Sequence, residues 1–180
     1  MSRWLVVALL CLSACSWEHK VNRLTDAEFD HYYALKPLMS DEERKEYLLL
    51  KTQEERDAWL HGHHPEGAYD RVSVAYWDMF YNYPDVLRKK IVDGAVEVGW
   101  KKEMVLMAWG APYDKRRLTG RDAARSEMLV YRFEQQEDGS VLVYEPGSKT
   151  AYKSVRNFTR EVYVDDDRVT EIIEKDGWPG

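Results

Sequence analysis

The chain has 180 residues and a mass of 21.2 kDa, with 44% hydrophobic and 13% aromatic residues. This composition suits a folded chain with a substantial core and excludes a collagen-like or wholly disordered protein. Two cysteines are too few for a disulfide scaffold. The 26 basic and 32 acidic residues give a net charge of −6, which argues against nucleic acid as a partner.

The first residues have the layout of a secretory signal. Arg3 precedes an apolar run, residues 4–12, that is too short to span a bilayer as a helix. The run ends in Leu12-Ser13-Ala14-Cys15, which resembles the lipobox of bacterial lipoproteins. The resemblance implies removal of residues 1–14 and acylation of Cys15, which would anchor the protein to a membrane without crossing it. The alternative is that Cys15 is a spare thiol beside an ordinary cleavage site.

The residue after Cys15 bears on the location of the anchored protein. Ser16 stands there in place of aspartate, and by resemblance to the sorting pattern of Gram-negative lipoproteins this favours the outer membrane. Residues 15–24 are then a short lipidated tether between the membrane and the folded part.

Three short helices are expected after the tether, because a Ser or Thr precedes a Glu by three residues at each start. This spacing is the signature of a capping box, and it occurs at Thr25 and Glu28, Ser40 and Glu43, and Thr52 and Glu55. Residues 61–67 (HGHHPEG) read as a loop. Apolar spacing then predicts helices over 69–83, from Pro84 to Val92, and from Lys101 to Trp109.

From Glu127 the apolar period changes to two, which is typical of strands. Residues 128–134 and 141–145 flank Asp138-Gly139, and residues 159–164 and 168–174 flank Asp165-Asp166-Asp167, so two hairpins are predicted. Helices followed by antiparallel strands indicate an α+β fold. We expect a helical region over 25–83 and an α+β region over 84–175, with 25–175 forming one compact unit.

The candidate sites for chemistry are weak. His61, His63 and His64 are possible zinc ligands, with Glu66 or Asp70 as an acidic partner, but they lack the helical spacing of an HExxH motif. The three aspartates at 165–167 lack the spacing of a calcium loop, so we read them as turn residues. No nucleophile, base and oxyanion donor occur together in a known pattern. We therefore expect no enzymatic activity, no cofactor and no metal, with the His loop as the alternative.

Residues 91–115, IVDGAVEVGWKKEMVLMAWGAPYDK, resemble the SmpA/OmlA (BamE-like) lipoprotein domain. Gly99-Trp100-Lys101 stands where that family has Gly-Met-Thr, so the usual N-cap hydroxyl is absent, and the helix closes at Trp109-Gly110-Ala111-Pro112. The resemblance covers about 84–175 and implies two helices followed by an antiparallel sheet. It also implies a partner in outer-membrane protein assembly.

Residues 38–60, LMSDEERKEYLLLKTQEERDAWL, together with Gly99-Trp100, resemble GWxTD-domain proteins of bacteria. Thr-Asp does not follow Gly99-Trp100 here. This resemblance implies a bacterial protein family and no particular activity.

Aromatic residues around the predicted helix at 101–109 have two interpretations. Trp100 and Trp109 suit core positions; alternatively Trp100, Trp109, Pro112 and Tyr113 form a partly exposed patch that binds a protein partner. The sequence thus predicts a non-enzymatic binding or assembly module, lipid-anchored in the cell envelope and facing envelope proteins. A metal-dependent protein and a purely structural surface lipoprotein are the alternatives.

Overall fold

The computed structural model describes residues 20–65, 74–144 and 154–178. Its contacts divide the chain into two compact units, with the boundary between Val92 and Asp93. The helices and the sheet each have a core of their own; the single compact unit over 25–175 stays a prediction from the sequence. Among the described residues, no helix combines the length and the apolar character needed to cross a membrane.

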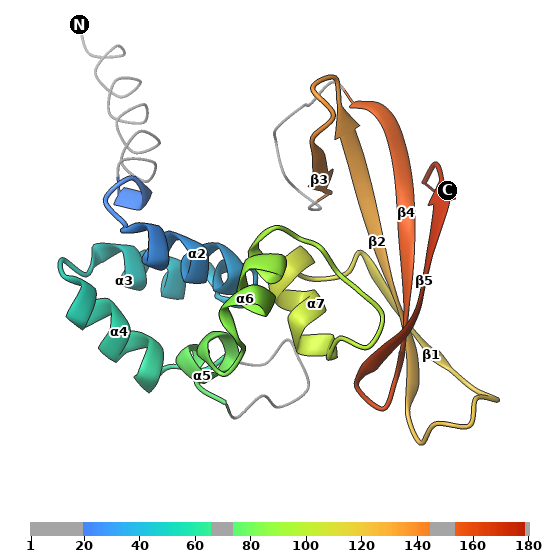
Figure 1. The fold of residues 1–180 in the computed structure, drawn as a ribbon, viewed down its shortest axis with the longest axis horizontal. Helices are drawn as coiled ribbons and strands as arrows, with labels where there is room; N and C mark the ends of the chain where they lie inside the picture. Colours follow the sequence, from blue (N-terminus) through green and yellow to red (C-terminus); the bar gives the residue numbers. More distant parts are fainter. Residues whose placement is uncertain (1–19, 66–73, 145–153, 179–180) are drawn as a thin grey trace, which may run out of the picture. The chain divides into compact units, whose positions relative to one another are not determined.

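The first unit is helical (Figure 1). After a short turn it contains α2 (Asp26–Leu35), the 3₁₀ turn η1 (Lys36–Leu38), α3 (Asp41–Leu49), α4 (Gln53–Gly62), α5 (Tyr76–Tyr81) and α6 (Asp85–Val92). All three predicted capping boxes are present: the side chain of the N-cap residue accepts a bond from the backbone of the Glu, and that Glu accepts one from the N-cap backbone. The predicted starts of the first three helices are therefore confirmed.

Aromatic rings form the centre of the helical unit. Tyr32 stacks on Tyr47 at 5.6 Å between centroids, Tyr47 meets the edge of Trp59 at 5.7 Å, and Trp59 stacks on Tyr76 at 5.8 Å. The hydroxyl of Tyr76 donates to the carbonyl of Leu38 at 3.1 Å, so its polar end is satisfied inside the core. This ring series holds α2, α3, α4 and α5 together.

Two local predictions in this unit need correction. His61 and Gly62 belong to the end of α4 and not to a loop, because glycine is tolerated in the last helical position and the chain turns extended only at His63. The helix expected over 69–83 begins only at Tyr76, with Ala75 as an extended N-cap residue, and residues 66–73 lie outside the described part.

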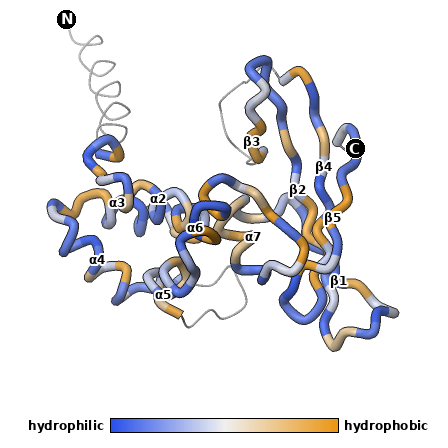
Figure 2. Tube along the Cα trace, in the orientation of Figure 1, coloured by the Kyte–Doolittle hydropathy of each residue, from blue (hydrophilic) through white to orange (hydrophobic). Residues whose placement is uncertain are grey.

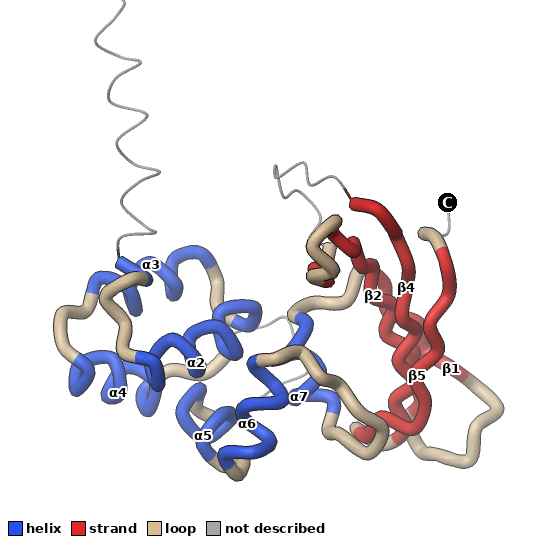
Figure 3. The backbone as a smooth tube through the Cα atoms, turned by 45° about the horizontal axis from the view of Figure 1, so that its top comes forward, coloured by secondary structure: helices blue, strands red, loops and turns tan. Residues whose placement is uncertain are grey.

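The second unit contains one helix and a sheet. Helix α7 (Lys102–Trp109) precedes β1 (Asp114–Leu118), β2 (Ser126–Gln136), β3 (Val141–Val143), β4 (Ser154–Asp165) and β5 (Arg168–Asp176). The strands, red in Figure 3, are antiparallel in the order β1-β2-β4-β5, and β3 pairs with the other end of β2. The α+β class predicted from the sequence is confirmed.

Both predicted hairpins are present. Gly139, with a φ of 85°, turns the chain between β2 and β3. Asp166 and Asp167 have φ values of 46° and 64° between β4 and β5, and two positive φ angles are what a two-residue type I′ turn requires. Strand β1 was not predicted: it reads DKRRL, and such a charged sequence is tolerated at the edge of a sheet.

The start of α7 is held by the β4–β5 hairpin. Its N-cap residue, Lys101, makes no side-chain capping bond. Instead, the amide of Lys102 donates to the carbonyl of Asp167 at 2.9 Å, and Gly99 and Trp100 exchange backbone bonds of 2.8 Å with Val169. The hairpin thus satisfies the first amide of α7, which has no partner within the helix.

One face of the sheet carries the core of this unit. Trp109 of α7 meets the ring edges of Tyr131 and Phe133 at 5.2 and 5.0 Å, and Phe133 stacks on Phe158 at 5.1 Å. Apolar positions of α7 and the strands are orange in Figure 2, whereas α3 and α4 are mainly blue. The helix α7 is therefore almost wholly buried, and α3 and α4 expose most of their charged residues.

Candidate functional site

The four residues of the predicted aromatic patch do not share a surface. Trp100 and Trp109 are buried, with 5% and 7% of their surface exposed, and the Nε1 of Trp109 donates to the carbonyl of Gly94 at 2.8 Å. Pro112 is half-buried, whereas Tyr113 is 43% exposed. The exposed patch that includes the two tryptophans is a wrong prediction, because both rings fill the core of the sheet unit. Tyr113 remains as the surface residue.

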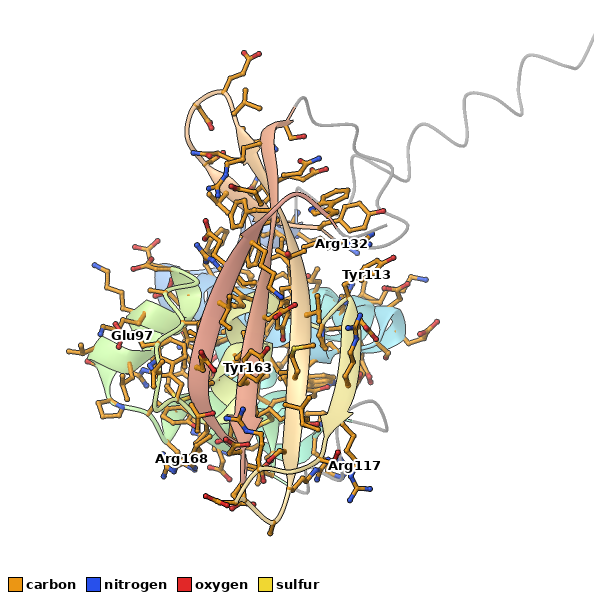
Figure 4. All side chains as sticks on the ribbon, turned by 90° about the vertical axis from the view of Figure 1, so that its right-hand side faces the viewer. Glu97, Tyr113, Arg117, Arg132, Tyr163 and Arg168 are labelled. Atoms are coloured by element: carbon orange, nitrogen blue, oxygen red, sulfur yellow. The ribbon has the colours of Figure 1, made fainter. Side chains whose placement is uncertain are left out.

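Tyr113 belongs to a different surface group, the aromatic–arginine cluster, which comprises Tyr113, Arg132, Tyr144 and Trp178. The Arg132 guanidinium lies 3.6 Å from the centroid of the Tyr113 ring and 5.4 Å from that of Trp178. The Tyr144 ring lies 4.7 Å from Trp178 and 6.4 Å from Tyr113. Figure 4 shows Tyr113 and Arg132 next to each other beside the sheet.

The cluster sits where β2 changes its pairing partner from β1 to β3. The amide of Tyr113 donates to the carbonyl of Val130, and the amide of Tyr144 donates to the carbonyl of Arg132, both at 2.8 Å. The Nε1 of Trp178 donates to the carbonyl of Phe133 at 3.2 Å. Sequence patterns missed Arg132, Tyr144 and Trp178, because these residues come from separate segments that only the sheet topology brings together.

The chemistry of this cluster suits recognition more than catalysis. A guanidinium over aromatic faces is attracted by the ring quadrupoles, and its planar shape stacks well on them. Tyrosine, tryptophan and arginine are the residues that most often dominate the binding energy of protein interfaces. Backbone bonds already fix the main chain at Tyr113 and Tyr144, and the indole bond holds the Trp178 ring, so little ordering is needed on binding.

The helical unit has an apolar groove with a volume of about 640 Å³. Phe29 and Tyr33 of α2 form its exposed aromatic wall, with ring centroids 4.3 Å apart, and Lys36 lies 4.5 Å over the Tyr33 ring. The remaining lining residues are Val21, Asn22, Tyr32, Asp41, Arg44, Lys45 and Leu48. The groove therefore combines aromatic walls with cationic and acidic residues at its sides.

A buried polar network lies in the same helical unit. Arg56 donates through Nε to the Glu28 carboxylate at 2.6 Å and through Nη1 to the carbonyl of Leu50 at 2.9 Å. Burial alone would raise the pKa of Glu28, but the bonds from Arg56 and Thr25 outweigh it and lower that pKa. Glu28 is fully buried, so the first capping box also supplies the anion of an internal ion pair.

His31 joins two tyrosines in the same network. Its Nδ1 lies 2.8 Å from the hydroxyl of Tyr81, and its Nε2 lies 2.5 Å from the hydroxyl of Tyr47. Burial lowers the pKa of His31 to about 4 and raises the pKa of Tyr47. A neutral imidazole has one donor and one acceptor nitrogen, so one tyrosine donates to it and the other accepts from it.

The three candidate metal ligands make separate contacts. His61 stacks on Trp77 at 4.3 Å between centroids. His63 stacks on Trp59 at 4.0 Å, and its Nδ1 lies 2.8 Å from the carbonyl of that tryptophan. His64 is exposed. Within residues 20–65, 74–144 and 154–178 no three His, Cys, Asp or Glu side chains are grouped to hold a metal ion; Glu66 and Asp70 lie outside these ranges.

The aspartates at 165–167 have structural contacts. Arg121 donates to the Asp165 carboxylate from Nε at 3.0 Å and from Nη2 at 2.7 Å. These bonds lower the pKa of that carboxyl to about 2. Asp166 accepts a bond from the Arg125 amide at 3.0 Å. The interpretation as turn residues agrees with the type I′ turn described above.

Cys15, the predicted lipidation site, lies outside the described residues. The lipobox, the SmpA/OmlA (BamE-like) similarity and the GWxTD similarity therefore stay predictions from the sequence. Comparison with known proteins adds no assignment: no protein-family model, no curated protein and no solved structure matches this chain.

Proposed function

We propose that the protein is a lipoprotein of the Gram-negative cell envelope, anchored through Cys15 to the outer membrane, whose sheet unit acts as a non-enzymatic binding or assembly module. The observation that carries the binding role is the aromatic–arginine cluster, in which Arg132 lies 3.6 Å from the ring of the exposed Tyr113. The motif Leu12-Ser13-Ala14-Cys15, followed by Ser16, supports the anchor.

Tethering explains how such a module would work. Acyl chains contribute about 0.8 kcal/mol for each buried methylene, so two or more chains hold a protein stably at a membrane surface. Confinement to that surface raises the effective concentration of the cluster for other envelope proteins. A modest surface of a few aromatic side chains is then sufficient for a useful interaction.

The sheet unit is the part that we assign to the SmpA/OmlA (BamE-like) type. A short helix ending at Gly110, followed by antiparallel strands, supports this assignment. Helix α6, which the resemblance includes, belongs to the helical unit in this structure. The partners that follow from the assignment are proteins of outer-membrane assembly.

The anchor is tested by replacing Cys15 with alanine in the full-length chain. We expect the wild-type protein to incorporate labelled palmitate and to sediment with outer membranes, and the Cys15→Ala variant to do neither. Incorporation of label into the variant would show that the acyl chains are attached elsewhere. An unlabelled wild-type protein would refute the anchor.

The binding role is tested by photo-cross-linking in intact cells from position 113. Val155 in β4, which is 62% exposed, gives a control position in the same unit. We expect one reproducible adduct with an envelope protein from position 113 that is absent from position 155. The adduct should weaken when Arg132→Met removes the guanidinium.

Two results would contradict the binding role. Equal adducts from positions 113 and 155 would show that contact is unspecific. If no adduct forms and deletion of the protein leaves barrel-protein levels and envelope integrity unchanged, the purely structural alternative is favoured.

A further inference from the structure

Strand β1 and the loop after it are basic, although the protein as a whole is acidic. Residues 114–125 read DKRRLTGRDAAR and contain five basic side chains and two acidic ones: Lys115, Arg116, Arg117, Arg121 and Arg125 against Asp114 and Asp122. The net charge of −6 therefore does not exclude a local basic site at this end of the sheet.

A pocket of about 410 Å³ lies within this basic segment and the start of β2. Its lining residues are Lys115, Arg117, Ala124, Arg125, Ser126 and Glu127. Three of the lining side chains are basic and one is acidic. Ala124 and Ser126 are small, so they leave room between the charged groups.

Glu127 organises the cations of the pocket. Only 5% of its side chain is exposed, and its carboxylate lies 2.5 Å from Lys102 Nζ, 3.1 Å from Lys115 Nζ and 4.0 Å from Arg125 Nη2. Burial alone would raise the pKa of Glu127, but the bonds from Lys102 and Lys115 outweigh it and lower that pKa. One carboxylate charge thus faces three cations, and it holds their side chains in place.

The register of β1 sets which side chains face the pocket. Arg117 is the partner of Glu127 across the strand pair, and Lys115 is the partner of Leu129, so both lie on the same side of the sheet as Glu127. Arg116 lies on the opposite side and bonds to Asp114 at 2.7 Å. Arg117 is exposed at the strand (Figure 4) and makes no ion pair with any residue that the structure describes.

We propose that this pocket binds a phosphate group, supplied either by free inorganic phosphate or by a lipid headgroup. Arg117 and Arg125 present guanidinium forks, which match two phosphate oxygens at once, and Lys115 adds a point charge. The cations are already gathered around Glu127, so binding needs little rearrangement. This site lies outside the aromatic–arginine cluster and does not depend on the role proposed for it.

The test compares two neighbouring arginines that differ in the face they occupy. Inorganic phosphate is titrated by calorimetry into the full-length protein in a non-ionic detergent, at fixed ionic strength and pH 7. We expect saturable binding that weakens at least about tenfold in Arg117→Gln, the equivalent of about 1.4 kcal/mol. Arg116→Gln removes the same charge one residue away and should change the affinity less than about twofold, because its side chain points to the other face.

A second ligand distinguishes the two sources of phosphate. Dihexanoyl phosphatidylglycerol, used below its micelle concentration, presents a phosphodiester with a glycerol headgroup and short acyl chains. Tighter binding than inorganic phosphate, lost in Arg117→Gln, identifies a lipid headgroup; equal or weaker binding identifies free phosphate. Arg117→Lys retains the charge and should restore part of the affinity in either case.

Two results would overturn the proposal. One is the absence of saturable binding of either ligand to a wild-type protein whose circular dichroism shows it to be folded. The other is an equal loss in Arg116→Gln and Arg117→Gln, which would mean that general surface charge attracts the anion. Arg117 is exposed on an edge strand, so its replacement should leave the melting temperature unchanged.

Discussion

Lowering the pH should destabilise the helical unit through one buried imidazole in particular, that of His31. It is 1% exposed and lies between the hydroxyls of Tyr47 and Tyr81. Burial lowers its pKa from 6.5 to about 4. Between these two values the unfolded chain binds a proton on this imidazole that the folded unit does not bind. The free energy of unfolding therefore falls as the pH falls through this window.

The size of the effect follows from the shift. One pKa unit corresponds to about 1.4 kcal/mol. Relative to neutral pH, His31 therefore lowers the free energy of unfolding by about 2 kcal/mol at pH 5 and by about 3 kcal/mol near pH 4. Below pH 4 the folded unit also binds the proton, and the loss levels off. Carboxylates such as Glu28 add their own dependence, so a comparison with a variant is needed to isolate the imidazole.

The assay is urea unfolding followed by circular dichroism at 222 nm, at half-unit steps from pH 7.5 to 4. His31→Gln places a non-ionisable polar group between the two tyrosines and should flatten the curve by about 2 kcal/mol between pH 7 and 5. His61→Gln removes an exposed imidazole from α4 and should follow the wild-type curve. The result that would refute the reasoning is a parallel pH dependence of wild type and His31→Gln.

Three further changes test a buried ion pair, a hydrogen bond of the sheet unit and the β4–β5 turn. Arg56→Met leaves the Glu28 carboxylate buried without its cation, so urea unfolding should show a loss of about 3–5 kcal/mol; the double variant that adds Glu28→Gln should recover much of it, and no recovery would refute the role of the pair. Trp109→Phe keeps the ring contacts but leaves the Gly94 carbonyl without its donor, and we expect a loss of about 1–3 kcal/mol; an unchanged urea midpoint would show that this bond contributes nothing. Asp167→Gly should preserve the melting temperature, whereas Asp167→Val should lower it, because a β-branched residue resists a positive φ; equal effects would contradict the turn assignment.

Features that depend on neighbouring residues were predictable from the sequence. The capping boxes at Thr25, Ser40 and Thr52 need only a hydroxyl and a Glu three residues later, and all three form. Asp138-Gly139 and Asp166-Asp167 supply residues that tolerate positive φ, and both hairpins form. In each case the interaction is complete within a few residues, so no tertiary information is required.

Features that depend on topology were not predictable in the same way. Tyr113, Arg132, Tyr144 and Trp178 meet only because β2 pairs with β1 along one part and with β3 along another. The burial of Trp109 depends on which face of α7 packs against the sheet. Aromatic residues are common both in cores and at interfaces, so the residue type alone does not decide between the two. Strand β1 has no apolar alternation that a sequence pattern could detect. Its backbone pairing with β2 makes it a strand.

The bond between Lys102 and Asp167 has a consequence for the order of folding. The amide that begins α7 is satisfied by a carbonyl 65 residues later in the chain. A helix of eight residues is too short to persist by itself in water. We therefore expect α7 to form only when this long loop closes, which is a slow step because the contact joins residues far apart in the chain. Hydrogen exchange at Lys102 and in the β4–β5 hairpin should consequently become protected in the same kinetic phase, as one cooperative folding unit.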